Sequence, residues 1–182
     1  RSSKVIFNGN LKNPVSIKGF NDNSIYFDDC IVDMNFTNIS ELSNLHNQFL
    51  SLPSALTFYN SDVVIKSSTF KKNLRGDDFI NFYNSDFIIN DCLIENSFSD
   101  AIDSDFSKGK IYNLHLKNIG NDGLDFSGSE VEIYDSFFEN VMDKAVSAGE
   151  SSKLIFKNSN VSNSELAIVV KDGSELISES NI

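Results

Sequence analysis

The chain has 182 residues, and its 40% hydrophobic content is enough for the core of one domain. Its formal net charge of −11 argues against a nucleic-acid-binding surface, because such surfaces need clustered lysine and arginine. No apolar run approaches the roughly 18 residues that a membrane span requires, so membrane insertion is not expected.

The first 39 residues read as irregular strands. The stretch SIYFDDCIVDMNFTNI, residues 24–39, is rich in β-branched and aromatic residues, which favours strands. We expect Phe36 to stack in one column with Phe70. Cys30 and Cys92 lack the spacing of a metal site, so they are either two packed free thiols or a disulfide.

Residues 40–53 form an insertion between these strands and a more regular region. Ser40 could cap a helix here and Pro53 would end it. This pattern predicts a short helix or a lid-like loop at a corner, and an irregular packed loop fits equally well. The apolar residues at helix-compatible spacing are Leu42, Leu45, Phe49 and Leu52.

From about residue 54 the sequence repeats. A step of 22 leads from Ile89 to Ile111 and Ile133, and from Asn96 to Asn118 and Asn140. FYNSD at residues 58–62 recurs at 82–86, a step of 24. The predicted units are 54–77, 78–99, 100–121, 122–143 and 144–165, with an unfinished unit from 166. The fifth unit slips by one residue, which an extra residue in GESSK (residues 149–153) would explain.

Alternating apolar residues inside each unit indicate short strands joined by Asn, Asp, Ser and Gly turns. Strands that repeat every 22–24 residues predict an all-β fold, a parallel β-helix in a single domain spanning 1–182. A leucine-rich repeat has a similar period, but its helical return segment is missing here. Because the chain begins without Met and ends within a repeat, we expect an excerpt of a longer precursor with neighbouring domains.

Acidic residues gather at one corner of the predicted coils. Asp100 and Asp122 should stack, with Asp78 below them, and Asp103 should stack on Asp125. Ladder neighbours lie about 4.8 Å apart, so these carboxylates need a cation, a proton or water between them. Asp100 and Asp122 are therefore candidate calcium ligands, with solvated turn carboxylates as the alternative.

Two other columns are candidates for structure or binding. The Asn96, Asn118 and Asn140 amides should bond from coil to coil. Tyr59 and Tyr83 should stack on each other, either as packing or as a platform for a sugar ring.

The units GDDFINFYNSDFIINDCLIENSFSDAIDSDFS (residues 76–107), NIGNDGLDFSGSEVEI (118–133) and DKAVSAGE (143–150) resemble right-handed parallel β-helix repeats of the pectin-lyase-like superfamily. Similar coils occur in bacterial surface proteins. That resemblance implies either a non-catalytic surface module or a polysaccharide lyase, hydrolase or epimerase. For an enzyme, it implies acidic groups at Asp103, Asp105 and Asp125, and a basic group at Arg75 or Lys144, with calcium as a candidate cofactor.

Two functions remain open from the sequence. The first is a non-catalytic stalk or glycan-binding module of a secreted or cell-surface bacterial protein, with a polysaccharide or cell-surface glycan as partner. In it, Asp100, Asp122, Asp105, Tyr59 and Tyr83 would contact the ligand. The second is an enzyme in which Asp103, Asp125 and Lys144 carry the chemistry.

Overall fold

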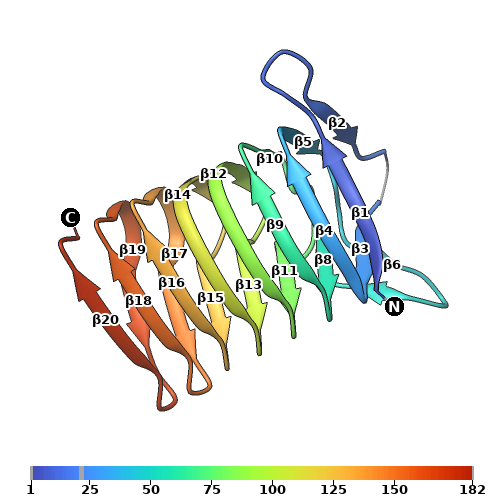
Figure 1. The fold of residues 1–182 in the computed structure, drawn as a ribbon. Helices are drawn as coiled ribbons and strands as arrows, with labels where there is room; N and C mark the ends of the chain where they lie inside the picture. The colour runs from blue at the N-terminus through green and yellow to red at the C-terminus, as the bar shows by residue number, and fades with distance from the viewer. Residues whose placement is uncertain (1, 21–22, 182) are drawn as a thin grey trace.

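The computed structural model describes residues 2–20 and 23–181, and over these residues it is a parallel β-solenoid of about seven turns (Figure 1). Each turn contributes strands to three faces, which we call face 1, face 2 and face 3. The described residues form no helix, and so none that could cross a membrane.

Face 1 shows most clearly how the turns stack, because its strands lie side by side from one end of the molecule to the other (Figure 1). Each strand pairs in parallel with the equivalent strand of the next turn. The strands are β1 (Ser3–Asn8), β4 (Cys30–Asn35), β9 (Asp62–Lys66), the first half of β12 (Asp86–Ser97), the first half of β14 (Lys108–Ile119), β16 (Glu130–Tyr134), β18 (Lys153–Lys157) and β20 (Glu175–Glu179).

Faces 2 and 3 complete each turn with further parallel strands. Face 2 contains β2 (Val15–Lys18), β5 (Thr37–Ser40), β10 (Thr69–Lys71), the second halves of β12 and β14, and the first parts of β17 (Phe137–Gly149) and β19 (Asn160–Val170). Face 3 contains β3 (Ile25–Asp28), β8 (Leu56–Tyr59), β11 (Asp78–Tyr83), β13 (Asp100–Asp105), β15 (Leu124–Ser127) and the last parts of β17 and β19.

The predicted columns are confirmed. Ile89 pairs with Ile111, and Ile111 with Ile133, and all three are buried. The one-residue slip is also present, since Ile133 pairs with Phe156 at a step of 23. A register shift between Val141 and Lys144 restores the step of 22 on face 3.

The expected place of Phe36 is wrong: Ile39 pairs with Phe70, and Phe36 lies at a corner with a φ of 46°.

The insertion is a small antiparallel hairpin, β6 (Leu45–His46) with β7 (Ser51–Leu52), so the predicted short helix is wrong and an inserted loop is correct. Asn47 closes the turn, because its Oδ1 accepts hydrogen bonds from the backbone N–H groups of Phe49 and Leu50, at 2.9 and 3.0 Å. The apolar residues do not share one face: Leu52 is buried, whereas Phe49 is 87% exposed.

Polar columns fix the corners. Asn118 donates from Nδ2 to Asn96 Oδ1 (3.1 Å), and Asn140 donates to Asn118 (3.0 Å), as the sequence predicts. A buried serine column was not predicted. In it, the Oγ of Ser85 accepts a hydrogen bond from the backbone N–H of Ser61 one turn earlier. The same bond recurs at Ser107, Ser129, Ser152 and Ser174.

Both cysteines are buried free thiols. Cys30 begins β4, where its N–H donates to Ser61 Oγ at 3.1 Å. Burial raises the pKa of Cys92 to about 11, so this thiol stays protonated and unreactive.

Candidate functional site

The predicted site residues gather on the outer side of face 3. Residues two apart along a strand point to the same side, so two adjacent columns of side chains face outward here. One column runs through Asn81, Asp103 and Asp125, which pair directly in the sheet. The other runs through Tyr59, Tyr83 and Asp105.

Inward-facing residues hold these columns in place. Ile80, Ile102 and Leu124 alternate with the polar residues, and all three are fully buried. Small residues follow the acidic corner, namely Ala101 and Ala145 with Gly123 between them. A Cβ added at Gly123 would lie 2.5 Å from the carbonyl oxygen of Ala145, so only glycine lets the chain pass this close.

Asp78, Asp100 and Asp122 form the second acidic column, at the corner that leads into face 3. Asp78 pairs with Asp100, and Asp100 Oδ1 accepts a hydrogen bond from the backbone N–H of Asp122 at 2.9 Å. Asp122 Oδ1 in turn accepts one from the N–H of Lys144 at 3.0 Å. Asp100 and Asp122 therefore each bind the backbone of the next turn, which accounts for the stacking that the sequence predicts.

Burial raises the pKa values of these three carboxyl groups. It raises the pKa of Asp78 to about 7, although a 2.6 Å hydrogen bond from Ser54 Oγ opposes the shift. Burial also raises the pKa of Asp100 to about 6, against the opposing hydrogen bonds from Asp122 and Asn121. The pKa of Asp122 is raised for the same reason.

Asp103 and Asp105 form a hydrogen-bonded pair with Asn81. The Nδ2 of Asn81 donates to Asp103 Oδ2 at 2.9 Å and to Asp105 Oδ2 at 3.3 Å. Burial, followed by the neighbouring charges of Asp78 and Asp105, raises the pKa of Asp103 to about 9. Asp103 is therefore protonated at neutral pH, and it donates a hydrogen bond to Asp105, whose pKa burial also raises.

Lys144 occupies the end of the second acidic column. Its Nζ lies 3.1 Å and 3.2 Å from the two carboxylate oxygens of Asp122, and it also pairs with Asp143. Burial alone would lower the pKa of Lys144, but the hydrogen bonds to Asp143 and Asp122 outweigh it and raise the pKa. A base would need the opposite shift, so this geometry favours an ion pair.

Asp100, Asp122 and Asp125 are close enough to share a cation. Each can offer one carboxylate oxygen, and these oxygens lie within 4.8 Å of one another. Calcium prefers such ligands, so the donor set fits the ion expected from the sequence. Asp125 is an addition to the predicted pair. Lys144 already supplies a positive charge to Asp122, which competes with a metal ion there.

The tyrosines form an exposed aromatic row beside the carboxyls. Tyr59 and Tyr83 stack with ring centroids 5.2 Å apart and 15° between the planes, and both rings are exposed. Tyr26 stacks on Tyr59 at 6.5 Å, and Phe106 meets Tyr83 edge-on at 5.9 Å. The repeat pattern alone placed neither Tyr26 nor Phe106 in this row.

Three polar members of this face were missed from the sequence. Asn81 lies next to Asp103 in the column, and its amide joins two carboxyls. Thr57 pairs with Asn81, and Ser147 pairs with Asp125, so two hydroxyls extend the column at its ends. Both hydroxyls are buried without a hydrogen-bond partner among the described residues. The 22- and 24-residue steps would have identified all three.

No protein-family model matches this chain, and no curated protein matches it either. The resemblance to pectin-lyase-like proteins therefore rests on the repeat pattern, and the structure supports its coarser part, a parallel β-solenoid.

Proposed function

We propose that the outer side of face 3 binds a glycan, as the module of a secreted or cell-surface protein. The observation that carries this proposal is the continuity of the Tyr59–Tyr83 stack with Asp105 in one column. Because the Tyr59 and Tyr83 rings cover each other's faces, a sugar would meet their exposed edges and hydroxyl groups, while carboxyl and amide groups bond sugar hydroxyls. Stacked turns about 4.8 Å apart repeat these groups along the axis, which suits a linear polysaccharide.

A binding experiment with substitutions tests the proposal. We expect Tyr83→Ala to weaken binding of the best ligand from a polysaccharide panel by about tenfold or more, measured by calorimetry. Phe137→Ala is the matched control, because Phe137 is an exposed aromatic on face 2 that meets His115 edge-on at 6.2 Å, away from the site. Equal losses in both variants, or no binding across neutral and acidic polysaccharides, would overturn the proposal.

The second candidate function is a polysaccharide-active enzyme, favoured by the proton that Asp103 retains at neutral pH. Asp103 and Asp105 cannot act as the pair of a glycoside hydrolase, because directly hydrogen-bonded carboxyls are closer than the separation of about 5 Å or more that such pairs need. Asp125 would then be the partner of Asp103. Release of reducing ends or unsaturated uronates that Asp103→Asn abolishes would favour this candidate over simple binding.

In either function, calcium would bind at Asp100, Asp122 and Asp125. Because Lys144 competes for Asp122, we expect calcium to raise the melting temperature only slightly in the wild-type chain and more in Lys144→Gln. Melts in calcium and in EDTA measure this difference. Asp100→Asn should abolish this rise in melting temperature. A rise that persists in the variant would show that calcium binds at another site.

A further inference from the structure

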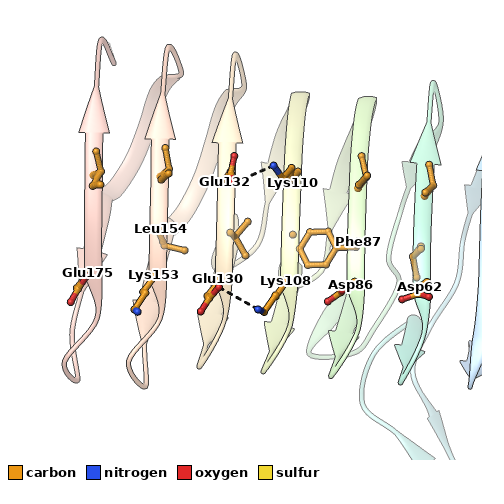
Figure 2. A pocket seen from close by; sticks show the side chains of 17 residues that line it. Asp62, Asp86, Phe87, Lys108, Lys110, Glu130, Glu132, Lys153, Leu154 and Glu175 are labelled. Atoms are coloured by element: carbon orange, nitrogen blue, oxygen red, sulfur yellow. Dashed lines mark ion pairs between the residues drawn. The ribbon is translucent and has the colours of Figure 1, made fainter.

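The outer side of face 1 carries three columns of side chains, and the first two line a hollow of about 710 Å³ (Figure 2). They run across all eight strands of face 1: β4 and β1 add Ile31 and Lys4 to the first column, Asp33 and Ile6 to the second, and Asn35 and Asn8 to the third. The six rungs from β9, β12, β14, β16, β18 and β20 are named below. Column a is Asp62, Asp86, Lys108, Glu130, Lys153 and Glu175. Column b is Val64, Ile88, Lys110, Glu132, Ile155 and Ile177. Column c is Lys66, Asn90, Tyr112, Tyr134, Lys157 and Glu179.

This face differs in charge from the rest of the chain. Its three columns hold six carboxylates and five lysines, whereas the whole chain has 26 acidic and 15 basic residues. It also exposes large apolar side chains, with Ile88 at 41% and Ile177 at 55% exposure. Two such faces can therefore meet without the repulsion that the net charge of −11 would otherwise cause.

Over the six rungs from β9 to β20, column b has the same order of residue types in both directions, if a lysine is matched with a glutamate. β4 and β1 then extend past the end of the partner. Its central rungs are Lys110 and Glu132, which form a 3.3 Å ion pair within the chain (Figure 2). Two apolar residues flank this pair on each side. When the column is turned end to end against a copy of itself, Lys110 faces Glu132, and every apolar residue faces another apolar residue.

The other two columns match in that same register. In column a, Asp86 faces Lys153 and Lys108 faces Glu130, and only the outermost rungs, Asp62 and Glu175, bring like charges together. In column c, Lys66 faces Glu179, Asn90 faces Lys157 and Tyr112 faces Tyr134.

We propose that face 1 is the interface of a twofold-symmetric dimer of this chain. The two solenoid axes run antiparallel, and the twofold axis lies parallel to the strands, between β14 and β16. Each column then meets its own copy, as an isologous interface requires. A shift by one rung in either direction would place Lys110 against Lys110 or Glu132 against Glu132, so charge selects this register.

The small area of the face limits the strength of the dimer. Six strands about 4.8 Å apart, with about five residues of 3.3 Å each, cover roughly 500 Å² per copy. This is well below the roughly 800 Å² that a standard interface buries per partner, so we expect a dissociation constant on the order of 10–100 µM.

Sedimentation velocity and light scattering over about 5 µM to 1 mM protein test the proposal. We expect the wild-type chain to shift from monomer to dimer across this range. Lys110→Glu and Glu132→Lys should each weaken the dimer by at least tenfold, because like charges then face each other. An equimolar mixture of the two variants should form the dimer again, since a glutamate of one copy then faces a lysine of the other at both central rungs. The double variant K110E/E132K should dimerise like the wild type.

The matched control is Lys117 with Glu139, an ion pair of 3.4 Å between neighbouring turns on face 2. Lys117→Glu and Glu139→Lys remove a comparable pair and should leave dimerisation unchanged. A wild-type chain that stays monomeric to 1 mM, a dimer that the face 1 variants do not weaken, or a mixture that fails to restore it would each overturn the proposal.

Discussion

Single residues at the corners carry much of the order between turns. Asn96, Asn118 and Asn140 all adopt left-handed backbone conformations, with φ between 54° and 58°, and their side chains bond from turn to turn. Asparagine tolerates this conformation better than other residues with a Cβ. The column therefore combines a backbone requirement with a hydrogen bond.

Two substitutions separate these contributions. Asn118→Gly removes only the side-chain bonds and should lower the free energy of unfolding by about 1 kcal/mol. Asn118→Ala removes the same bonds but keeps a Cβ in the left-handed region without asparagine's polar side chain, and should cost about 1 kcal/mol more than glycine. Urea denaturation of both variants measures the difference, and an alanine variant as stable as the glycine variant would show that the backbone is unstrained.

The buried carboxyls predict that stability depends on pH. Asp103 has a pKa near 3.9 when unfolded and about 9 when folded, so the unfolded chain releases a proton that the folded chain keeps. The contribution is complete below about pH 4 and is lost as the pH rises through about 9. Asp78 and Asp100, with pKa values raised to about 7 and about 6, act in the same direction.

We therefore expect a lower melting temperature at pH 8 than at pH 5.5. Asp103→Asn, which stays neutral, should be more stable than the wild type at pH 8 by at least about 1 kcal/mol and should reduce the pH dependence. The control is Asp33→Asn at an exposed position, which should behave like the wild type. A wild-type chain that becomes more stable from pH 5.5 to 8 would contradict the assignment.

At the scale of elements, the hairpin β6–β7 is attached to the solenoid by only part of its length. Leu52 is 8% exposed, whereas Phe49 at the tip is 87% exposed. Leu52→Ala should cost about 2 kcal/mol of stability, and Phe49→Ala should change it by no more than about 0.5 kcal/mol. Thermal melts compare the two, and equal losses would mean that the tip packs against the solenoid.

An element can be predicted from the sequence when the same type of side chain recurs at its equivalent positions in successive turns. Ile89, Ile111 and Ile133 locate three turns, because inward positions must stay apolar. The sequence did not separate a helix from a loop over residues 40–53, because leucines spaced for a helix also fit a hairpin that buries only some of them. The corner of Asp100 and Asp122 was predicted from its spacing, but the raised pKa of Asp103 was not, since it depends on how deeply the side chain lies.

The serine column was not predicted for a different reason. Serine is common in turns, so Ser85 and Ser107 looked like solvated loop residues, although both are buried and bond the next turn. The matching charges on face 1 could not be predicted either, because they become visible only when the pairing register of the strands is known.

At the scale of the whole molecule, each turn contacts only the turns before and after it, so stability should vary along the axis. Inner side chains of the central turns are fully buried, whereas Leu166 and Val170 of β19 are more than 40% exposed. We expect amide hydrogen exchange in this chain to be slowest in β12, β14 and β16, and fastest in β1–β3 and β19–β20. Uniform exchange along the axis would instead indicate one cooperative unit.

The extra residue near Glu150 and Ser151, both with left-handed backbones, shows where the architecture accommodates change. The corner absorbs it while Phe156 still falls beneath Ile133. Peptides grafted at successive corners of this kind would project from one side of the solenoid at a fixed spacing. The chain could therefore serve as a scaffold that displays epitopes at defined separations.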